Sequence, residues 1–230
     1  MPTLLITGAS TGIGAATARL AAGAGWDVVL SARSEDKLRA LADELGSEHT
    51  HVVRCDVTEW DEQQRLVAEA LDRFGQIDAA FANAGFGAKR GFLEEDPAFW
   101  RSMVLTNVLG PALTIRAVLP HFLERDAGHF LITSSVAGRR SLPGSLYSAT
   151  KHAATAIGEA LRSELRQIHE NFSVRVTLIE PGMVDTPFFE NKPERALEPA
   201  DIGRAVMYAL DQPPGVDVNE MLIRPVTQPA

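Results

Sequence analysis

Tyr147 and Lys151 stand four positions apart in a segment whose apolar residues have helical spacing. Side chains four residues apart share one face of a helix, so the phenol and the ammonium point the same way. A free tyrosine has a pKa near 10 and is a poor proton donor or acceptor at neutral pH. Lowering that pKa by about three units takes roughly 4 kcal/mol, which needs positive charge in a partly desolvated site. In most proteins such a pair, taken by itself, is only a feature of a helix surface.

A glycine-rich loop near the N-terminus could bind phosphate. It follows a short apolar run, opens an alanine-rich stretch and reads Thr7-Gly8-Ala9-Ser10-Thr11-Gly12-Ile13-Gly14. Gly8 permits a tight turn, Gly12 lets the backbone approach a pyrophosphate, and Gly14 lets the helix pack close to the strand. The phosphates would then lie at the positive N-terminus of that helix. The pattern predicts a dinucleotide site, although a plain turn before a helix also favours glycine.

Strand-like and helix-like segments alternate along the whole chain. Seven short apolar or β-branched runs predict strands at residues 4–7, 28–31, 52–55, 77–82, 129–133, 174–179 and 221–224. Apolar residues three and four apart predict helices at residues 15–24, 37–45, 59–74, 98–124, 149–169 and 200–210. Pro111 and Pro120 predict a kink or two helices within residues 98–124. We expect an α/β fold: one domain over residues 1–230, built on a doubly wound parallel sheet of about seven strands with helices on both faces.

Composition excludes several classes of protein. The 230 residues are 45% hydrophobic and 23% charged, as in an average globular chain, and the formal net charge is −8 without a basic block. Nucleic acid is therefore an unexpected partner. Cys55 is the lone cysteine, the six histidines lack metal-ligand spacing, and neither a signal peptide nor an uninterrupted apolar run of membrane length is present. We expect no metal, no membrane partner and a cytoplasmic location.

Three motifs together resemble the short-chain dehydrogenase/reductase family. They are the glycine loop, Asn83-Ala84-Gly85 after the fourth predicted strand, and Tyr147-Ser148-Ala149-Thr150-Lys151. They occur in the family's order, and the resemblance runs from residue 3 to about residue 186. Ala82 stands where the family usually has the first of two asparagines. The resemblance implies a Rossmann-type sheet of seven strands, a nicotinamide dinucleotide cofactor and hydride transfer between a carbonyl and an alcohol. It assigns Tyr147 as the general acid/base, whose pKa Lys151 and the oxidised nicotinamide would lower together, and it has Lys151 hold the nicotinamide ribose.

The resemblance also implies a serine that orients the substrate oxygen, and two neighbours compete for that role. The family's serine is usually followed by two residues and a glycine, which selects Ser135 before Gly138. The spacing to the tyrosine favours the other serine: in the family it is commonly 13 residues, which Ser134 has, whereas Ser135 lies 12 residues before Tyr147. We choose Ser135, because the following loop can lose a residue whereas a strand end cannot.

Further contacts follow from the same resemblance. Asn107 matches the helix asparagine whose backbone carbonyl holds a water linking Lys151 to solvent; a bend in the helix is the structural alternative. A segment after the sixth strand resembles the family's nicotinamide clamp, with the Val184 backbone and the Thr186 hydroxyl at the carboxamide, and it reads Pro181-Gly182-Met183-Val184-Asp185-Thr186. His152 next to Lys151 faces away from the Tyr147 side of the helix and is interpreted as structural.

The end of the second predicted strand bears on the choice of cofactor. Ala32 stands where the family has a carboxylate for the ribose of NAD, and Arg33 offers a fork of donors suited to the 2′-phosphate of NADP. We therefore expect NADP(H), with Ser10 and Ser34 adding hydroxyl contacts and NAD(H) as the alternative; a solvated Arg33 is the competing interpretation. Asp56 and Val57 resemble the family's adenine-contacting pair, although Asp56 also suits a helix start.

Several functions and assemblies stay open. The tail from Val218 to Gln228 resembles bacterial NADP-dependent 3-hydroxy acid (serine-type) dehydrogenases, whereas Phe92, Phe188 and Phe189 suit a reductase of bulkier ketones or aldehydes. A non-catalytic NADP(H)-binding redox sensor is the alternative from another class. A sugar-nucleotide epimerase would need a larger C-terminal region. Small residues along the helix after Tyr147 predict a homodimer or homotetramer, since in this family that helix commonly packs against its copy. They are Ala153, Ala154, Ala156 and Gly158, beside Leu161 and Leu165.

Overall fold

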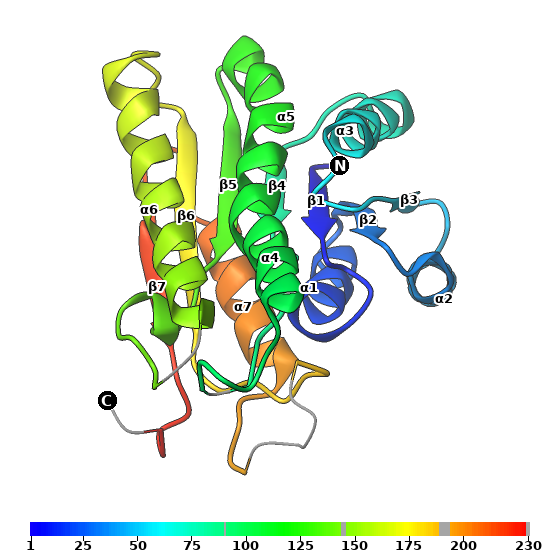
Figure 1. The fold of residues 1–230 in the computed structure, drawn as a ribbon. Helices are drawn as coiled ribbons and strands as arrows, with labels where there is room; N and C mark the ends of the chain where they lie inside the picture. The colour runs from blue at the N-terminus through cyan, green and yellow to red at the C-terminus, as the bar shows by residue number, and fades with distance from the viewer. Residues whose placement is uncertain (90, 144–145, 189–193, 229–230) are drawn as a thin grey trace.

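All seven strands form one parallel sheet, in the order β3-β2-β1-β4-β5-β6-β7 (Figure 1). The computed structural model describes residues 1–89, 91–143, 146–188 and 194–228. The strands are β1 (Thr3–Thr7), β2 (Asp27–Ala32), β3 (Thr50–Arg54), β4 (Ala79–Ala82), β5 (Gly128–Thr133), β6 (Val174–Pro181) and β7 (Glu220–Ile223). The predicted α/β class and strand number are confirmed, with strand ends shifted by a residue or two.

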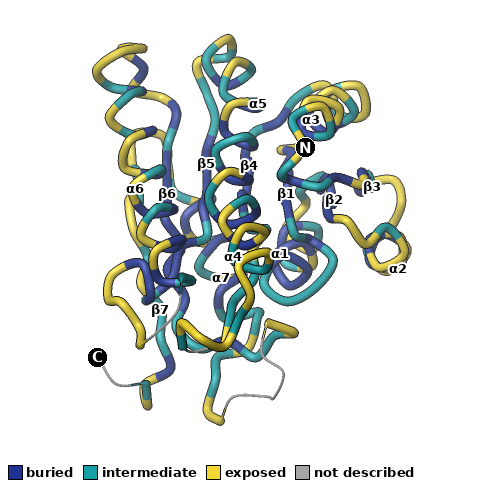
Figure 2. Tube along the Cα trace, in the orientation of Figure 1, coloured by how far each residue is buried: buried dark blue, intermediate teal, exposed yellow. Residues whose placement is uncertain are grey.

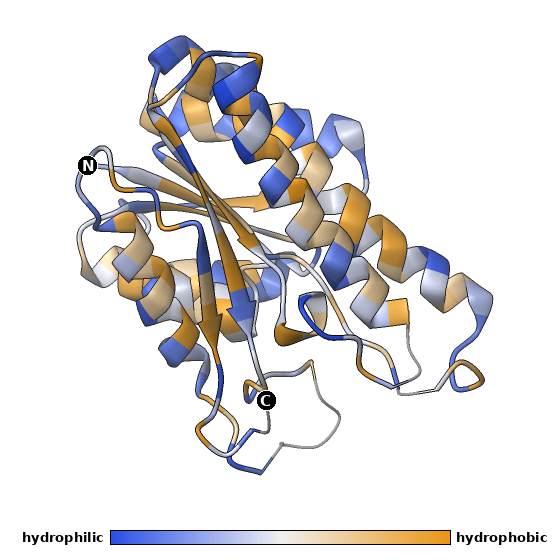
Figure 3. Ribbon diagram, turned by 90° about the vertical axis from the view of Figure 1, so that its left-hand side faces the viewer, coloured by the Kyte–Doolittle hydropathy of each residue, from blue (hydrophilic) through white to orange (hydrophobic). Residues whose placement is uncertain are grey.

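Helices cover both faces of the sheet (Figure 3). One hydrophobic core lies between the sheet and α1 (Gly12–Gly23), α2 (Glu35–Leu45) and α7 (Pro199–Leu210). The other core contains residues of α3 (Trp60–Phe74), α5 (Gly110–Arg125) and α6 (Leu146–Gln167). Short elements complete the chain: α4 (Pro97–Val104), η1 (Leu105–Leu109) and η2 (Val136–Gly138).

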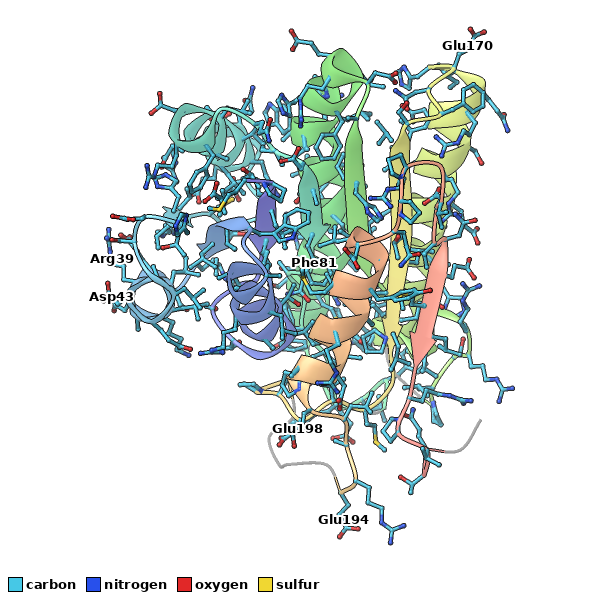
Figure 4. All side chains as sticks on the ribbon, turned by 180° about the vertical axis from the view of Figure 1, so that it is seen from behind. Arg39, Asp43, Phe81, Glu170, Glu194 and Glu198 are labelled. Atoms are coloured by element: carbon cyan, nitrogen blue, oxygen red, sulfur yellow. The ribbon has the colours of Figure 1, made fainter. Side chains whose placement is uncertain are left out.

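The central strands are apolar on both faces because both faces are covered. Leu5 in β1 pairs with Val29 of β2 on one side and with Ala80 of β4 on the other. All three are fully buried, and the strands form the dark centre of Figure 2. Viewed from behind, Phe81 lies in the interior, whereas labelled charged residues such as Glu170 and Glu194 extend outward (Figure 4).

The helical segment from α4 to α5 is irregular at a different position from the two prolines at which the sequence predicts a kink. Its irregularity is the π-helical turn η1, in which the Gly110 amide donates to the Leu105 carbonyl. Pro111 lies in the first turn of α5, where the lack of an N–H group is tolerated. Pro120 lies inside α5 without ending it. The expected disturbance is therefore present, but just ahead of Pro111 and not at Pro120.

The same segment, Pro97–Arg125, is long and apolar enough to span a membrane by length and composition, which the sequence analysis did not anticipate. Its inward side chains, among them Met103, Val118 and Phe122, are fully buried in this fold. Core helices of water-soluble proteins meet the same criterion, so this observation is weak as an argument for a membrane.

The strand order brings distant loops together at one edge of the sheet. β1 lies between β2 and β4, so the chain reverses its direction of winding at β1. In open parallel sheets such a reversal opens a crevice at the carboxyl ends of the strands. The segments after β1, β4, β5 and β6 therefore meet there, and they carry the predicted motifs.

Two glycines of α1 test how tightly the loop is packed. A Cβ on Gly14 would lie 2.3 Å from the Gly8 carbonyl oxygen, whereas a Cβ on Gly23 meets nothing within 4 Å. We expect Gly14→Ala to lower the free energy of unfolding by about 3 kcal/mol, because backbone must move. Gly23→Ala should raise it by about 0.5 kcal/mol through reduced chain entropy. Chemical denaturation of both variants measures the difference, and equal effects would contradict the packing.

Candidate active site

One cavity of about 830 Å³ runs along the carboxyl ends of the strands. It extends from the glycine loop and Arg33 to Tyr147 and the segments that follow β5 and β6. Every predicted site residue lines it except Gly14 and Asn107, which lie behind its wall. The predicted residues that line it are Gly8, Ser10, Thr11, Gly12, Ile13, Arg33, Ser34, Asp56, Val57, Asn83, Ala84, Gly85, Ser135, Tyr147, Lys151, Pro181, Gly182, Val184 and Thr186.

The glycine loop has the backbone that a dinucleotide cradle requires. Gly8 and Gly12 have φ values of 68° and 56°, in the left-handed region that favours glycine. The first turn of α1 contains no acidic residue, and Thr11 at its N-cap makes no side-chain capping bond. The amides at this helix start are thus suited to an anion, which fits the phosphates of a dinucleotide.

The Thr7 hydroxyl at the end of β1 hydrogen-bonds the loop after β4. Thr7 Oγ1 accepts hydrogen bonds from the backbone amides of Asn83 (3.1 Å) and Ala84 (3.2 Å). Asn83 Nδ2 in turn donates to the Thr7 carbonyl (3.2 Å). Ala82 at the end of β4 is compatible with this arrangement, because the contacts use the residues that follow it.

The other end of the cavity lies beyond β2 and β3. The Arg33 side chain is 63% exposed, and its Nη1 lies 4.0 Å from Asp56 Oδ2. Asp56 Oδ1 accepts from the amide and hydroxyl of Thr58, so this residue both shapes the turn before α3 and lines the cavity. Ser34 is the N-cap of α2 and makes no side-chain capping bond.

The two candidate serines after β5 have different surroundings. The Ser134 hydroxyl is buried against α6, where it donates to the Lys151 carbonyl (3.0 Å) and contacts Thr155 Oγ1 (2.7 Å). The Ser135 hydroxyl donates to the Pro181 carbonyl (3.3 Å), lines the cavity together with Tyr147 and lowers the pKa of its phenol. The geometry thus joins Ser135 to Tyr147 and gives Ser134 a packing position.

Tyr147 and Lys151 share one face of α6, and their electrostatics differ from the simplest expectation. Lys151 Nζ lies 5.8 Å from the centroid of the Tyr147 ring and donates to the Thr133 carbonyl (2.9 Å). Burial raises the pKa of Tyr147 to about 12, against the lowering influence of the Ser135 hydrogen bond. Burial also lowers the pKa of Lys151 to about 8. The predicted lowering of the tyrosine pKa relies on Lys151 together with the oxidised nicotinamide; with the protein's residues alone, the desolvation of the phenol prevails.

Asn107 lies in η1, and its side chain links the loop after β4 to α6. Its side chain donates to the Phe86 carbonyl (2.8 Å) and accepts from the Phe86 amide (3.0 Å), and it also donates to Thr150 Oγ1 (3.2 Å). Pro111, four residues on, has no N–H to donate to the Asn107 carbonyl. π-helical turns of this kind often mark functional sites.

The segment after β6 forms the wall opposite α6. The Gly182 amide donates to the Ile223 carbonyl of β7 (2.7 Å), and Val184 forms a bridge with Leu197. A Cβ on Gly12 would lie 3.1 Å from Thr186 Cγ2, so Thr186 reaches the glycine loop. The predicted clamp residues are thus in contact with the predicted phosphate cradle.

An ion-pair network that the sequence analysis missed holds the segment after Ser135. Arg139 Nε donates to the buried Glu180 carboxylate of β6 (2.8 Å), and Arg139 Nη2 pairs with Glu220 of β7. Burial raises the pKa of Glu180, and Arg139 opposes that shift. No sequence motif signals this network, because its members come together only in the sheet.

Other residues that line the cavity were also missed. They include Phe86, Leu142, Met183 and Gln228. Phe188, predicted to suit bulkier ketones or aldehydes, packs edge-on to the Tyr147 ring at a centroid distance of 5.4 Å. Phe92, proposed for the same apolar pocket, is exposed and does not line the cavity, and Phe189 lies outside the described residues.

His152 and the acidic residues add no second site. His152 is exposed, and its Nδ1 bonds the Ser148 carbonyl (2.9 Å), in agreement with the structural interpretation. Within residues 1–89, 91–143, 146–188 and 194–228, no group of three or more His, Cys, Asp or Glu side chains could hold a metal ion.

Comparison with known proteins identifies the family. Residues 2–196 match the family model of the short chain dehydrogenases. This chain belongs to that family. An uncharacterized oxidoreductase of Staphylococcus haemolyticus is 40% identical over 226 residues, which covers 96% of each chain.

Two solved structures share nearly the whole fold with this short chain dehydrogenase. An alcohol dehydrogenase from the archaeon Thermococcus sibiricus, complexed with 5-hydroxy-NADP, is 34% identical with a TM-score of 0.90 and covers 100% of this chain and 99% of its own. Serine dehydrogenase from Escherichia coli is 30% identical with a TM-score of 0.89 and covers 99% and 100%. Other similar structures hold NADP+ or NADH.

The buried ammonium predicts a dependence of stability on pH. Below pH 8 Lys151 carries its charge in both the folded and the unfolded state, so the cost of burying that charge lowers the free energy of unfolding in full. Between pH 8 and about 10.5 the folded state releases the proton first, and the cost declines. We expect Lys151→Met to raise the free energy of unfolding by about 1–2 kcal/mol at pH 7 and by less at pH 10. Urea titrations at both values measure this, and a gain that grows with pH would contradict it.

Proposed function

We propose that this short chain dehydrogenase is an NADP(H)-dependent oxidoreductase that interconverts a ketone or aldehyde and the corresponding alcohol. One observation carries the proposal: Ser135, Tyr147 and Lys151 line the same cavity that the glycine loop lines. The phosphate cradle and a proton donor are thus joined by one continuous space. The complexes with NADP+ and NADH among similar structures support a nicotinamide cofactor.

The bound nicotinamide supplies or accepts the hydride. Tyr147 gives its proton to the alkoxide oxygen during reduction and takes it back during oxidation, while the Ser135 hydroxyl holds the same oxygen. Lys151 contributes positive charge that favours the ionised phenol and binds the ribose hydroxyls. The Asn107 carbonyl, to which Pro111 has no N–H to donate, is assigned to a water that passes the proton from Lys151 to solvent.

Three single substitutions test the chemistry. We expect Tyr147→Phe to lower kcat for NADPH-dependent ketone reduction by at least about 100-fold, since the proton donor is lost. Ser135→Ala should lower kcat by about 100-fold through loss of the hydrogen bond to the oxygen. Ser134→Ala is the matched control and should stay within a few-fold, because its hydroxyl faces α6. Steady-state oxidation of NADPH against ketones and aldehydes measures all three.

Two results would overturn these assignments. Equal losses in the two serine variants would remove the distinction between Ser134 and Ser135. Tight NADPH binding without turnover across ketones, aldehydes and 3-oxo acids would favour the redox-sensor alternative.

The proposed preference for NADP(H) rests on Arg33 and Ala32. Arg33 is exposed beside the cavity, and its contact with Asp56 is long, so the guanidinium is free to meet a 2′-phosphate. Ala32 supplies no carboxylate that would repel that phosphate or accept a ribose hydroxyl.

We expect Ala32→Asp combined with Arg33→Ala to shift the ratio of kcat/KM for NADPH over NADH by at least about 100-fold towards NADH. The change adds an acceptor for the ribose hydroxyl and removes a donor for the phosphate. Parallel kinetics with both cofactors measure the ratio, and an unchanged ratio would contradict the assignment.

Ketones and aldehydes are the better-supported substrates. Where the structure describes the far end of the cavity, its lining includes Phe86, Leu142, Met183 and Phe188. The described cationic residues of the cavity are Arg33 and Lys151, both of them already assigned to the cofactor. The alternative, a 3-hydroxy acid, is supported by the similarity of fold to serine dehydrogenase.

The proposed location is cytoplasmic.

The proposed assembly is a homodimer or homotetramer in which α6 packs against its copy in a second subunit. Of the small residues predicted for this contact, Ala154 and Gly158 are buried within the fold, whereas Ala156 is exposed. Ala149 and Ala160 of α6 are exposed as well, and so are Val104 of α4 and Leu109 of η1. An exposed apolar surface of this kind suits a second copy of the chain.

The assembly predicts a solution mass of at least twice 24.9 kDa at micromolar concentration. Light scattering coupled to gel filtration measures it. Ala156→Arg should shift the mass towards the monomer, since it places a charge in the contact. A monomeric mass for the wild-type protein would contradict the assembly.

A further inference from the structure

The C-terminal tail enters the active-site cavity. After β7 the chain turns at Pro225, whose carbonyl accepts from the Gln228 amide (2.9 Å). The exposed Val226 and Thr227 form the tip of this turn, and Gln228 lines the cavity. Figure 1 shows the chain leaving β7 at the carboxyl ends of the strands, on the side of the predicted motifs.

The Gln228 side chain is held against the wall opposite α6. Its Oε1 accepts from the Met183 backbone amide (2.9 Å). It also covers Gly182 so closely that a Cβ there would lie 2.2 Å from Oε1. Gly182 follows Pro181, whose carbonyl accepts from the Ser135 hydroxyl. The carboxamide therefore lies near the substrate end of the cavity.

The chemistry of this contact fixes the orientation of the carboxamide. Because the Met183 amide is a donor, only the oxygen of the side chain can face it. The two hydrogens on Nε2 then point elsewhere, and they have no hydrogen-bond partner among the residues that the structure describes. Gln228 thus offers neutral donors in a region whose other described lining is mainly apolar.

Resting on the proposed function, we propose that Gln228 is a substrate-binding residue that donates a hydrogen bond to a second, uncharged oxygen of the substrate. The class that fits is a ketone with a nearby ester, amide or keto oxygen. A free carboxylate would find no cation among the described cavity residues apart from Arg33 and Lys151, which are assigned to the cofactor. A simple ketone would leave the donors of Gln228 unused.

A pair of substrates and a pair of variants test the proposal. Ethyl 3-oxobutanoate and 2-heptanone have chains of equal length, but only the first carries a second oxygen acceptor. The readout is the ratio of kcat/KM for the ester over 2-heptanone within each variant, compared with the wild-type ratio. The intrinsic reactivity of each ketone cancels in that comparison.

Gln228→Glu is the decisive variant. Its carboxylate still accepts from the Met183 amide but replaces the donor with an acceptor. We expect the ratio to fall roughly three- to tenfold in Gln228→Glu and Gln228→Ala, mainly through KM of the ester, as for one hydrogen bond. Thr227→Ala, at the exposed tip of the same turn, should keep the wild-type ratio.

The opposing outcomes are distinct. An unchanged ratio in both Gln228 variants would overturn the proposal, and so would a ratio that falls in Gln228→Ala yet holds in Gln228→Glu, because then only the Met183 contact matters. Absence of turnover by the wild-type enzyme with both ketones would contradict the proposed function itself.

Discussion

The Thr7 hydroxyl is the contact on which the site depends. It is buried at the carboxyl end of β1, and it accepts two amide hydrogens from the loop after β4. The phosphate cradle and the loop that leads to Asn107 are therefore held at a fixed separation at the point where the sheet reverses its winding. A valine at this position would keep the shape of the strand but would leave two amides without their acceptor.

The sequence was most informative where local rules decide the structure. Seven strands and the main helices follow from hydrophobic periodicity, since each strand must be apolar on both faces in a covered parallel sheet. The positions of Gly8 and Gly12 follow from backbone geometry that other residues rarely adopt. Most of the predicted site residues line one cavity for the same reason, because motifs at strand ends must meet at one edge of a parallel sheet.

Features that depend on tertiary packing were not predictable in the same way. The bend ahead of Pro111 takes the form of a π-helical turn whose register is set by packing, whereas Pro120 is accommodated without a break. The pKa of Tyr147 moves upward because the degree of burial is a property of the assembled fold. Gln228 reaches the cavity through a turn beyond the last strand, and no sequence motif in this segment indicates that its side chain lines the cavity.

The placement of the tail separates two properties of the protein. β7 is the edge strand of the sheet, half of its residues are exposed, and the residues beyond it touch the wall of the cavity without entering the two hydrophobic cores. Changes in the composition of residues 224–228 would therefore bear on the proposed substrate contact while both hydrophobic cores, Ser135, Tyr147 and Lys151 stay the same. Related oxidoreductases can consequently diverge in this segment with little effect on folding.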